Sequence, residues 1–407
     1  MATIHPFAAL LPQPSIAPRL CELPYDVMST DEARAIADGN PLSFLRVSKP
    51  EIELPPGTDP YAPEVYARGR DNLRRLIDQG ALVRDAQPSF YLYRQCVGSH
   101  SQTGLVAAAS CQEYLDGIIR KHELTRVDKE DDRVRHIDTL NAQTGPVFLT
   151  YRAQPEIDTL VSDQTDRPPL VDFTAADNVR HTSWRVADPG TVRRLSDLFD
   201  RIPRLYIADG HHRSAAAARV FQARQGAANA AGFLTVIFPH NQMRILPYNR
   251  GLKDLNGHSP SRLLALLAGT CELHPGAPAS PSAKHSLSLF LDGRWHGLSF
   301  RPDLLEGRSG IEALDVTLLQ DRILQPLFAI DDPRTSHRIQ FIGGIRGTDE
   351  LEHRVQNGEF ACAFSMHPTG IEDLMAIADA GGIMPPKSTW FEPKLRDAMF
   401  CLMLGPG

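Results

Sequence analysis

The sequence predicts a fold that mixes helices and strands, of the α+β or mixed α/β class. Short apolar runs typical of buried strands occur at 205–208 and 233–238. A long amphipathic segment with helix start and stop signals occurs at 63–79. The segment 287–300 alternates around Asp292-Gly293, a strong signal for a two-residue hairpin turn. Strands and helices are interleaved irregularly, which is typical of this class.

The first half of the chain contains both kinds of element. Residues 1–27 are rich in proline and poor in periodicity, and are expected to be extended strand and loop. Ser29-Thr-Asp-Glu32 is a capping-box pattern that predicts a helix over 30–38. The helix over 63–79 ends at Gly80. Further strands are expected at 89–94, 104–110, 146–151 and 170–186.

The second half continues this pattern around one proline-, alanine- and serine-rich loop at 275–283. The expected helices are 191–199, 214–225, 311–328 and 369–380. The expected segments are an N-terminal α+β segment over 1–150, a core over 151–270 and a C-terminal α+β segment over 284–407. Together these segments are expected to form one compact, multi-lobed unit.

Composition limits the classes of function and location. The 407 residues are 42% hydrophobic and 23% charged, with a formal net charge of −6 and a pI near 6.2. No basic field covers such a chain, so a nucleic-acid partner is not expected. No apolar run approaches the ~20 residues of a membrane helix, and the N-terminus lacks a signal-peptide pattern. Six scattered cysteines indicate reduced thiols and a cytoplasmic location. A homo-oligomer is compatible with the sequence.

The most informative segment is Asp209-Gly-His-His-Arg213, which joins the strand at 205–208 to an alanine-rich helix. A glycine turn that leads into a helix offers free N–H groups and a favourable dipole to an anion. Gly210, His211 and Arg213 are therefore candidate phosphate-binding residues, since arginine grips phosphate with paired hydrogen bonds. Asp209 is a candidate Mg²⁺ ligand or proton acceptor, with His212 as a second catalytic candidate. A helix cap or a turn acid is an equally good interpretation of Asp209.

Three further segments contain charged or polar side chains, and two of them carry candidate site residues. The charged stretch 129–136 as a whole is expected to be a solvated helix with surface ion pairs. Lys387, Ser388 and Thr389 follow two prolines that stiffen their loop, and could bind phosphate; a rigid surface loop is the alternative. Tyr25 and Asp26, after Pro24, could line a substrate pocket, while Asp26 could equally initiate a turn.

Several motifs, taken in order, resemble the uncharacterised bacterial DUF1015 family. They are Leu23-Pro-Tyr-Asp-Val27, Arg120-Lys-His-Glu-Leu-Thr125 with Asp128-Lys-Glu-Asp-Asp-Arg133, Asp209-Gly-His-His-Arg213, and Met384-Pro-Pro-Lys-Ser-Thr389 with Phe391-Glu-Pro-Lys394. The turn also resembles the phosphate-binding turn of the ParB/sulfiredoxin superfamily, which includes free-serine kinases. This second resemblance rests on one short motif. It implies a ParB/sulfiredoxin-like core with elaborating α+β segments, nucleotide binding and phosphoryl transfer.

The resemblance also bears on single residues in the 120–133 motif. His122 and Arg133 lie in its most distinctive part and become candidate phosphate-binding residues. Glu123 becomes the leading candidate for a catalytic base or a Mg²⁺ ligand, because Mg²⁺ usually takes one or two protein carboxylates plus substrate phosphates.

The resulting hypothesis is a small-molecule kinase that uses ATP or ADP with Mg²⁺. A free hydroxyl amino acid such as serine is the acceptor implied by the resemblance. Two alternatives remain open: a hydrolase of a phosphate ester or nucleotide, and a nucleotide-binding sensor without turnover.

Overall fold

The computed structural model describes residues 1–405 and confirms a mixed α and β fold. Residue contacts divide the chain into two units. Unit 1 comprises Met1–Met243 and the segment from Pro393 onward, and unit 2 comprises Arg244–Glu392. Unit 2 is thus inserted into unit 1, whereas the segments expected from the sequence were 1–150, 151–270 and 284–407.

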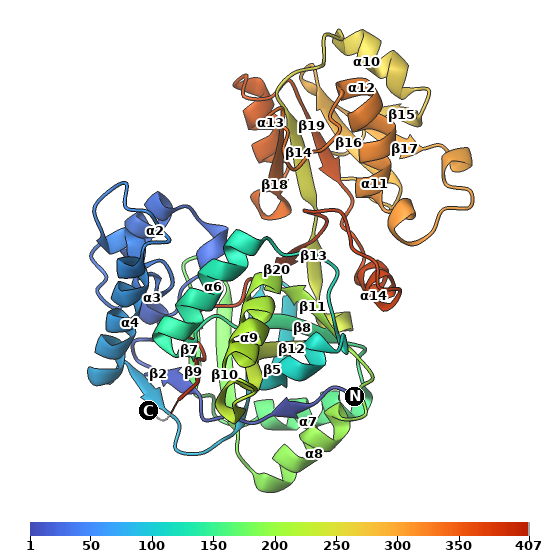
Figure 1. The fold of residues 1–407 in the computed structure, drawn as a ribbon. Helices are drawn as coiled ribbons and strands as arrows, with labels where there is room; N and C mark the ends of the chain where they lie inside the picture. Colours follow the sequence, from blue (N-terminus) through green and yellow to red (C-terminus); the bar gives the residue numbers. More distant parts are fainter. Residues whose placement is uncertain (406–407) are drawn as a thin grey trace. The chain divides into compact units, whose positions relative to one another are not determined.

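The centre of unit 1 is a large mixed sheet (Figure 1). In spatial order its strands are β6 (Ile119–Arg120), β11 (Leu205–Asp209), β8 (Val147–Tyr151), β12 (Gly232–Pro239), β5 (His100–Ser110), β4 (Phe90–Val97), β10 (Arg180–Val186) and β9 (Val171–Thr174), and β1 (Ile4–His5) also pairs with β5. β11 runs antiparallel to β8 and parallel to β6. All of β8 and almost all of β12 are buried, as expected for strands covered on both faces.

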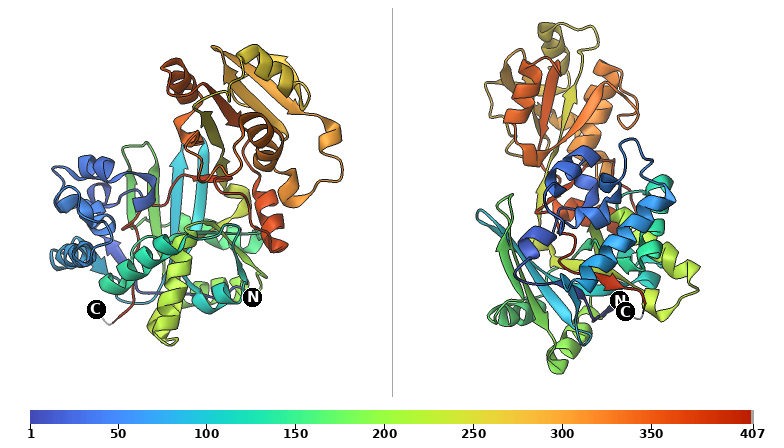
Figure 2. Two further views of the ribbon diagram at one scale, coloured as in Figure 1. Left: turned by 45° about the horizontal axis from the view of Figure 1, so that its top comes forward. Right: turned by 90° about the vertical axis from the view of Figure 1, so that its left-hand side faces the viewer.

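Helices surround this sheet, and α6 and α9 lie together against one of its faces (Figures 1 and 2). The helices of unit 1 are α1 (Ala17–Leu20), α2 (Thr30–Ala37), α3 (Leu45–Ser48), α4 (Pro63–Asp78), α5 (Cys111–Leu115), α6 (Val127–Leu140), α7 (Pro155–Thr165), α8 (Pro189–Phe199) and α9 (His211–Ala223). The predicted capping box starts α2, since the backbones and side chains of Ser29 and Glu32 bond reciprocally. The residues before it form more than strand and loop, because they include α1 and a 3₁₀ turn at Tyr25–Val27.

The chain beyond Pro393 completes unit 1. β21 (Leu402–Met403) pairs with β7 (Ala142–Gln143), and an isolated antiparallel β-bridge joins the backbones of Cys401 and Leu10. β2 (Leu10–Pro12) in turn pairs with β3 (Leu82–Arg84). Segments from the beginning and the end of the described chain are therefore interlocked by backbone hydrogen bonds.

Unit 2 contains a second sheet with its own helices. In spatial order the strands are β15 (Cys271–Pro275), β17 (Arg294–Phe300), β16 (Ser286–Leu291), β19 (Cys362–Met366), β14 (Tyr248–Leu252) and β18 (Ile339–Gly343), and a separate pair is formed by β13 (Arg244–Leu246) and β20 (Trp390–Glu392). The helices are α10 (Pro260–Leu267), α11 (Asp315–Leu319), α12 (Gln325–Phe328), α13 (Asp349–Gln356) and α14 (Ile371–Asp379).

Two sequence predictions in unit 2 had different outcomes. The hairpin is confirmed as β16–β17, with φ of 50° at Asp292 and 73° at Gly293, as a type I′ turn requires. The single helix expected over 311–328 is instead α11, a π-helical turn over 320–324 and α12. Pro326 lacks the N–H that would bond to Arg322, so a regular α-helix cannot continue there. None of the helices within residues 1–405 is long and apolar enough to cross a membrane.

Candidate functional site

The turn between β11 and α9 leaves a helix N-terminus open to an anion. β11 pairs with β8 through a register shift between Ile207 and Asp209, a kind of irregularity that re-aims side chains. Gly210 caps α9 with a φ of +93°, a conformation that residues with side chains rarely adopt. No side chain caps α9, so Asp209 is not the helix cap that one interpretation of the sequence proposed.

The Arg213 guanidinium lies beside this turn and is buried. Its Nη1 donates to the carbonyl of Pro146, and its Nη2 lies 3.4 Å from Asp209 Oδ2. Its Nε has no hydrogen-bond partner within residues 1–405. A Cβ on Gly145 would lie 3.5 Å from Arg213 Cδ and 2.8 Å from Asp397 Oδ1, so a side chain there would crowd both groups.

Two acids near Arg213, the partly buried Asp209 and the buried Asp397, differ in charge. Burial alone would raise the pKa of Asp209, but Lys394, whose Nζ is 3.5 Å from Oδ2, and Arg213 hold that pKa well below its usual range. Burial raises the pKa of Asp397 to about 7, although Arg213 opposes the shift. Asp209 is therefore a permanent anion near neutral pH, whereas Asp397 titrates there.

Helix α6 brings Arg133 toward the same region. Arg133 Nη2 lies 2.7 Å from Asp132 Oδ2, and the Tyr66 hydroxyl donates to Asp132 Oδ1 at 2.9 Å. The Arg133 guanidinium carbon lies 3.8 Å from the centre of the Tyr25 ring. Asp132, Arg133 and His136 are all buried, so the prediction that 129–136 is a solvated helix is wrong for these residues. They face inward because α6 packs between α4 and α9.

Residues from separate predicted motifs therefore meet in unit 1. Tyr25, Arg133, Arg213 and Asp397 line one small cavity of about 30 Å³. Such a volume holds no more than a few water molecules, so a larger ligand would have to occupy space outside it. Asp26, next to Tyr25, is exposed.

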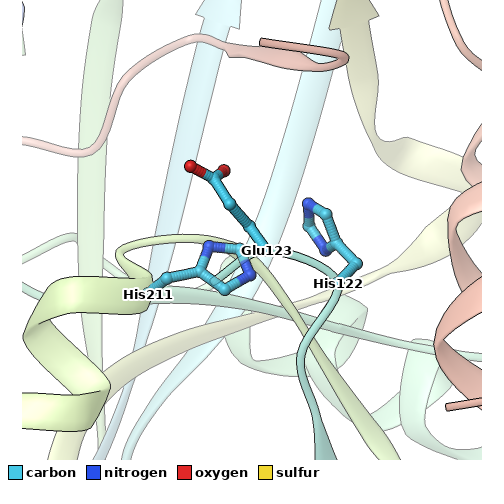
Figure 3. A group of neighbouring side chains, drawn as sticks. All are labelled: His122, Glu123 and His211. Carbon is cyan, nitrogen blue, oxygen red and sulfur yellow. The ribbon is translucent and has the colours of Figure 1, made fainter. Parts of the chain in front are cut away.

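A second group of side chains combines one residue of this turn with two residues that follow β6. His122 and Glu123 follow β6, and His211 is the first residue of α9 (Figure 3). The rings of His122 and His211 are perpendicular, with their centres 4.5 Å apart. Burial lowers the pKa of His122 to about 4 and that of His211 well below its usual value, so both rings are neutral at pH 7.

The neighbouring His212 has different surroundings. It is only partly buried, and its Nε2 accepts a hydrogen bond from the Arg126 backbone N–H at 3.1 Å. Burial lowers its pKa as well. The two adjacent histidines thus contact different segments, as expected for consecutive positions on a first helical turn.

The segment with Lys387, Ser388 and Thr389 belongs to unit 2. Lys387 is exposed, and its Nζ lies 3.4 Å from the Tyr248 hydroxyl. The Ser388 hydroxyl donates to the Pro385 carbonyl at 2.6 Å and so stabilises its own loop. A role for these three residues in the site of unit 1 stays a prediction.

The sequence interpretation assigned no role to two residues that contact the site. Lys394 pairs with Asp209, and Asp397 lies in the cavity beside Arg213. Lys394 belongs to the motif Phe391-Glu-Pro-Lys394. No local pattern marks Asp397, because its position depends on the return of the chain from unit 2 to unit 1.

The comparison with protein families gives a match that covers most of the chain. A family model described as "Protein of unknown function (DUF1015)" matches residues 4–317. The chain belongs to this family. The DUF1015 match includes Tyr25, His122, Arg133 and Arg213, and it ends before the segment with Lys387 and Lys394.

Solved structures give fainter similarities. A free serine kinase in complex with AMP is 14% identical over 70% of this chain and 90% of its own, with a TM-score of 0.35. A conserved hypothetical protein from Pyrococcus furiosus is 15% identical over 70% of this chain and 90% of its own, with a TM-score of 0.34. SbnI from Staphylococcus aureus, with a C-terminal truncation, is 10% identical over 72% of this chain and 85% of its own, with a TM-score of 0.38.

Similarities at this level establish neither fold nor activity for the DUF1015 chain. The ParB/sulfiredoxin-like character of its core stays a prediction. No match was found among curated proteins.

Proposed function

We propose that this DUF1015 protein is a phosphotransferase that moves a phosphoryl group from ATP or ADP to a free hydroxyl amino acid such as serine. The observation that carries the proposal is the buried Arg213 at a helix N-terminus that no side chain caps, beside Asp209 and Lys394. Phosphoryl transfer depends mainly on positioning and on charge stabilisation, and this turn offers groups for both.

The phosphate would lie at the first turn of α9. The backbone N–H groups after Gly210 would point toward such a ligand. The Arg213 Nε–H, which has no partner within residues 1–405, could donate a further hydrogen bond to it. Lys394 and Arg133 add positive charge nearby. Lys387, Ser388 and Thr389 of unit 2 remain further candidates for phosphate binding.

The acceptor hydroxyl needs an anionic group that receives its proton. Asp209 and Glu123 are the two candidates, with His212 at the adjacent position, and Asp209 stays ionised near neutral pH. The hydroxyl oxygen would form a bond to phosphorus while the bond from phosphorus to the leaving nucleotide oxygen breaks. The hydroxyl proton passes to the carboxylate, and Tyr25 and Asp26 would bind the rest of the acceptor.

Mg²⁺ is the metal that nucleotide chemistry implies, with Asp209 and Glu123 as its predicted ligands. Asp209 Oδ2 lies within 3.5 Å of both Arg213 and Lys394. Glu123 lies close to two imidazoles, those of His122 and His211. These surroundings suit protein-bound Mg²⁺ poorly, because Mg²⁺ prefers oxygen ligands in octahedral geometry. Mg²⁺ is better regarded as an ion that the nucleotide brings with its phosphates.

The experiment is ³¹P NMR of the protein with Mg²⁺, ATP or ADP, and a mixture of hydroxyl amino acids. A new phosphomonoester signal is expected, and Arg213→Lys should slow its appearance at least tenfold, since lysine cannot reproduce the paired hydrogen bonds. Arg219→Lys is the matched control, because Arg219 lies on the same helix but pairs with Glu130 and Asp131 at the surface.

Other outcomes would replace the proposal. Inorganic phosphate as the sole product would indicate a hydrolase. Nucleotide binding without turnover would indicate a sensor. If calorimetry also detects no nucleotide binding, the phosphate site itself is wrong.

A further inference from the structure

Three donor side chains of unit 1 lie close enough together to bind one metal ion. One nitrogen of His122, one nitrogen of His211 and one carboxylate oxygen of Glu123 all lie within 4.8 Å of one another. Two ligands of a single Zn²⁺ lie no more than about 4 Å apart, because each bond is about 2 Å long. Rotation of the partly exposed Glu123 side chain would bring its carboxylate closer to the two imidazoles (Figure 3).

The two imidazoles each hold a nitrogen that lacks a hydrogen bond. His122 is 2% exposed and His211 is 6% exposed, and neither His122 Nδ1 nor His211 Nε2 has a partner within residues 1–405. A buried polar atom without a partner costs about 1–3 kcal/mol, so a ligand at these atoms would relieve two such costs.

The backbone of Ile207 lies next to the His122 ring and favours its protonated form. Histidines that bind metals usually donate their second ring N–H to a carbonyl or carboxylate, which fixes the ring and its tautomer. The Ile207 backbone is the neighbouring group that could hold the His122 ring in this way.

We propose that the imidazoles of His122 and His211 and the carboxylate of Glu123 bind a divalent first-row transition metal, with Zn²⁺ as the best match. Two imidazoles and one carboxylate are a common ligand set for zinc, and the remaining position goes to water or substrate. Imidazole ligands select against Mg²⁺, which takes oxygen ligands. Under this proposal His122 and His211 bind the metal, in place of the direct phosphate contacts that the sequence predicted.

The position of the metal suggests what it would bind. His211 lies between Asp209 and Arg213 in the turn, so the open coordination position would lie beside the proposed phosphate site. A phosphate oxygen or the acceptor hydroxyl is the class of ligand that would fill it. This catalytic role rests on the proposed function, whereas metal binding itself does not.

The test is a calorimetric titration of chelator-treated, dialysed protein with Zn²⁺ alone. One equivalent is expected to bind, and His211→Ala and Glu123→Gln should each weaken binding by about 100-fold or more, beyond the effect of losing an outer-shell partner. His212→Ala is the matched control, because it removes the adjacent histidine, which lies outside the cluster, and should bind Zn²⁺ like the wild type.

Two outcomes would overturn the site: no binding of one equivalent, or binding that survives both His211→Ala and Glu123→Gln. If His211→Ala fails to fold, Glu123→Gln decides, since Glu123 is partly exposed and the substitution keeps its shape. Phosphoryl transfer by a protein that binds no Zn²⁺ would leave the proposed function intact and refute only the metal site. Zn²⁺ binding without any phosphoryl transfer would leave the metal site intact and refute only the proposed function.

Discussion

Arg213, Asp209 and Lys394 form a short row of alternating charge in unit 1. Two cations and one anion leave one net positive charge beside the first turn of α9. Removing a partner from a buried pair is costly, because the remaining charge is left without compensation. The row therefore stabilises Asp209 as an anion and still favours a negatively charged ligand over a neutral one.

Gly210 is the residue whose backbone decides the shape of the turn. Gly210→Ala should lower the free energy of unfolding by about 2 kcal/mol, because a side chain at φ +93° is strained. The new Cβ would also lie 3.1 Å from the Arg213 guanidinium carbon, so nucleotide affinity should fall too. Urea unfolding and calorimetry measure the two effects.

Gly80→Ala is the control for this substitution. Gly80 has a φ of +68°, and a Cβ at this residue would meet nothing within 4 Å, so the substitution should cost only about 1 kcal/mol and leave nucleotide affinity unchanged. Equal losses of affinity in both variants would show that Gly210 acts through general stability alone.

Asp315 in unit 2 should make stability depend on pH. Burial raises its pKa to about 7, while the unfolded chain has the usual value near 4. The folded state therefore binds the proton more tightly, and this contribution to stability is complete below about pH 4 and lost as the pH rises through 7. Asp315→Asn should remove that dependence, with a gain at pH 8 on the order of 4 kcal/mol at most.

Denaturant unfolding at pH 4, 6 and 8 checks this expectation. The asparagine can still accept the hydrogen bond from the His285 backbone N–H, which is 2.9 Å long in the wild type. A difference between wild type and variant that stays constant from pH 4 to pH 8 would contradict the raised pKa.

At the scale of elements, local signals in the sequence were enough to predict those turns and helix starts that depend on residues close together along the chain. The capping box at Ser29, the hairpin turn at Asp292-Gly293 and the glycine turn at Gly210 each depend on residues close in sequence. The helix α9 nevertheless begins at His211 rather than Ser214, because Gly210 caps it directly.

Tertiary packing decided what the sequence could not show. The charged helix α6 has a buried face because it packs against both α4 and α9, and a charge pattern alone cannot reveal neighbours so distant in sequence. Of the candidate site, the sequence identified Arg213, Arg133 and Tyr25, but Asp397 reaches the cavity only through the folding of unit 1.

The buried face of α6 can be tested with two adjacent acids. Asp132→Ala should destabilise the protein by about 3 kcal/mol, because it leaves the buried Arg133 without its counter-ion. Asp131→Ala should cost less than about 1 kcal/mol, because its pair with Arg219 is at the surface. Urea unfolding of both variants measures the difference, and similar losses would refute the assigned orientation of α6.

At the scale of the whole molecule, unit 2 is an insertion with adjacent ends. β13 and β20 pair antiparallel with Arg244 opposite Glu392, so the two chain crossings are neighbouring strands about 5 Å apart. Residues 244–392 should therefore be replaceable by a short glycine-serine linker that leaves the backbone pairing of unit 1 in place.

Circular dichroism and thermal unfolding of this deletion variant test whether unit 1 folds by itself. A single cooperative transition is expected. A chain that ends at Met243 is the matched control, and it should unfold because it lacks β21 and the bridge from Cys401 to Leu10. A deletion variant without cooperative unfolding would show that unit 1 requires unit 2.

The return of the chain to unit 1 also has a consequence for biosynthesis. Residues 1–243 leave the ribosome first. However, β7 cannot pair with β21, and Asp209 cannot pair with Lys394, until the end of the chain has been made. At ordinary elongation rates the intervening segment takes roughly ten seconds or more to make. The contiguous unit 2 can fold during this delay, so the half that is translated first is expected to mature last, and chaperones have that interval in which to protect its unpaired strands.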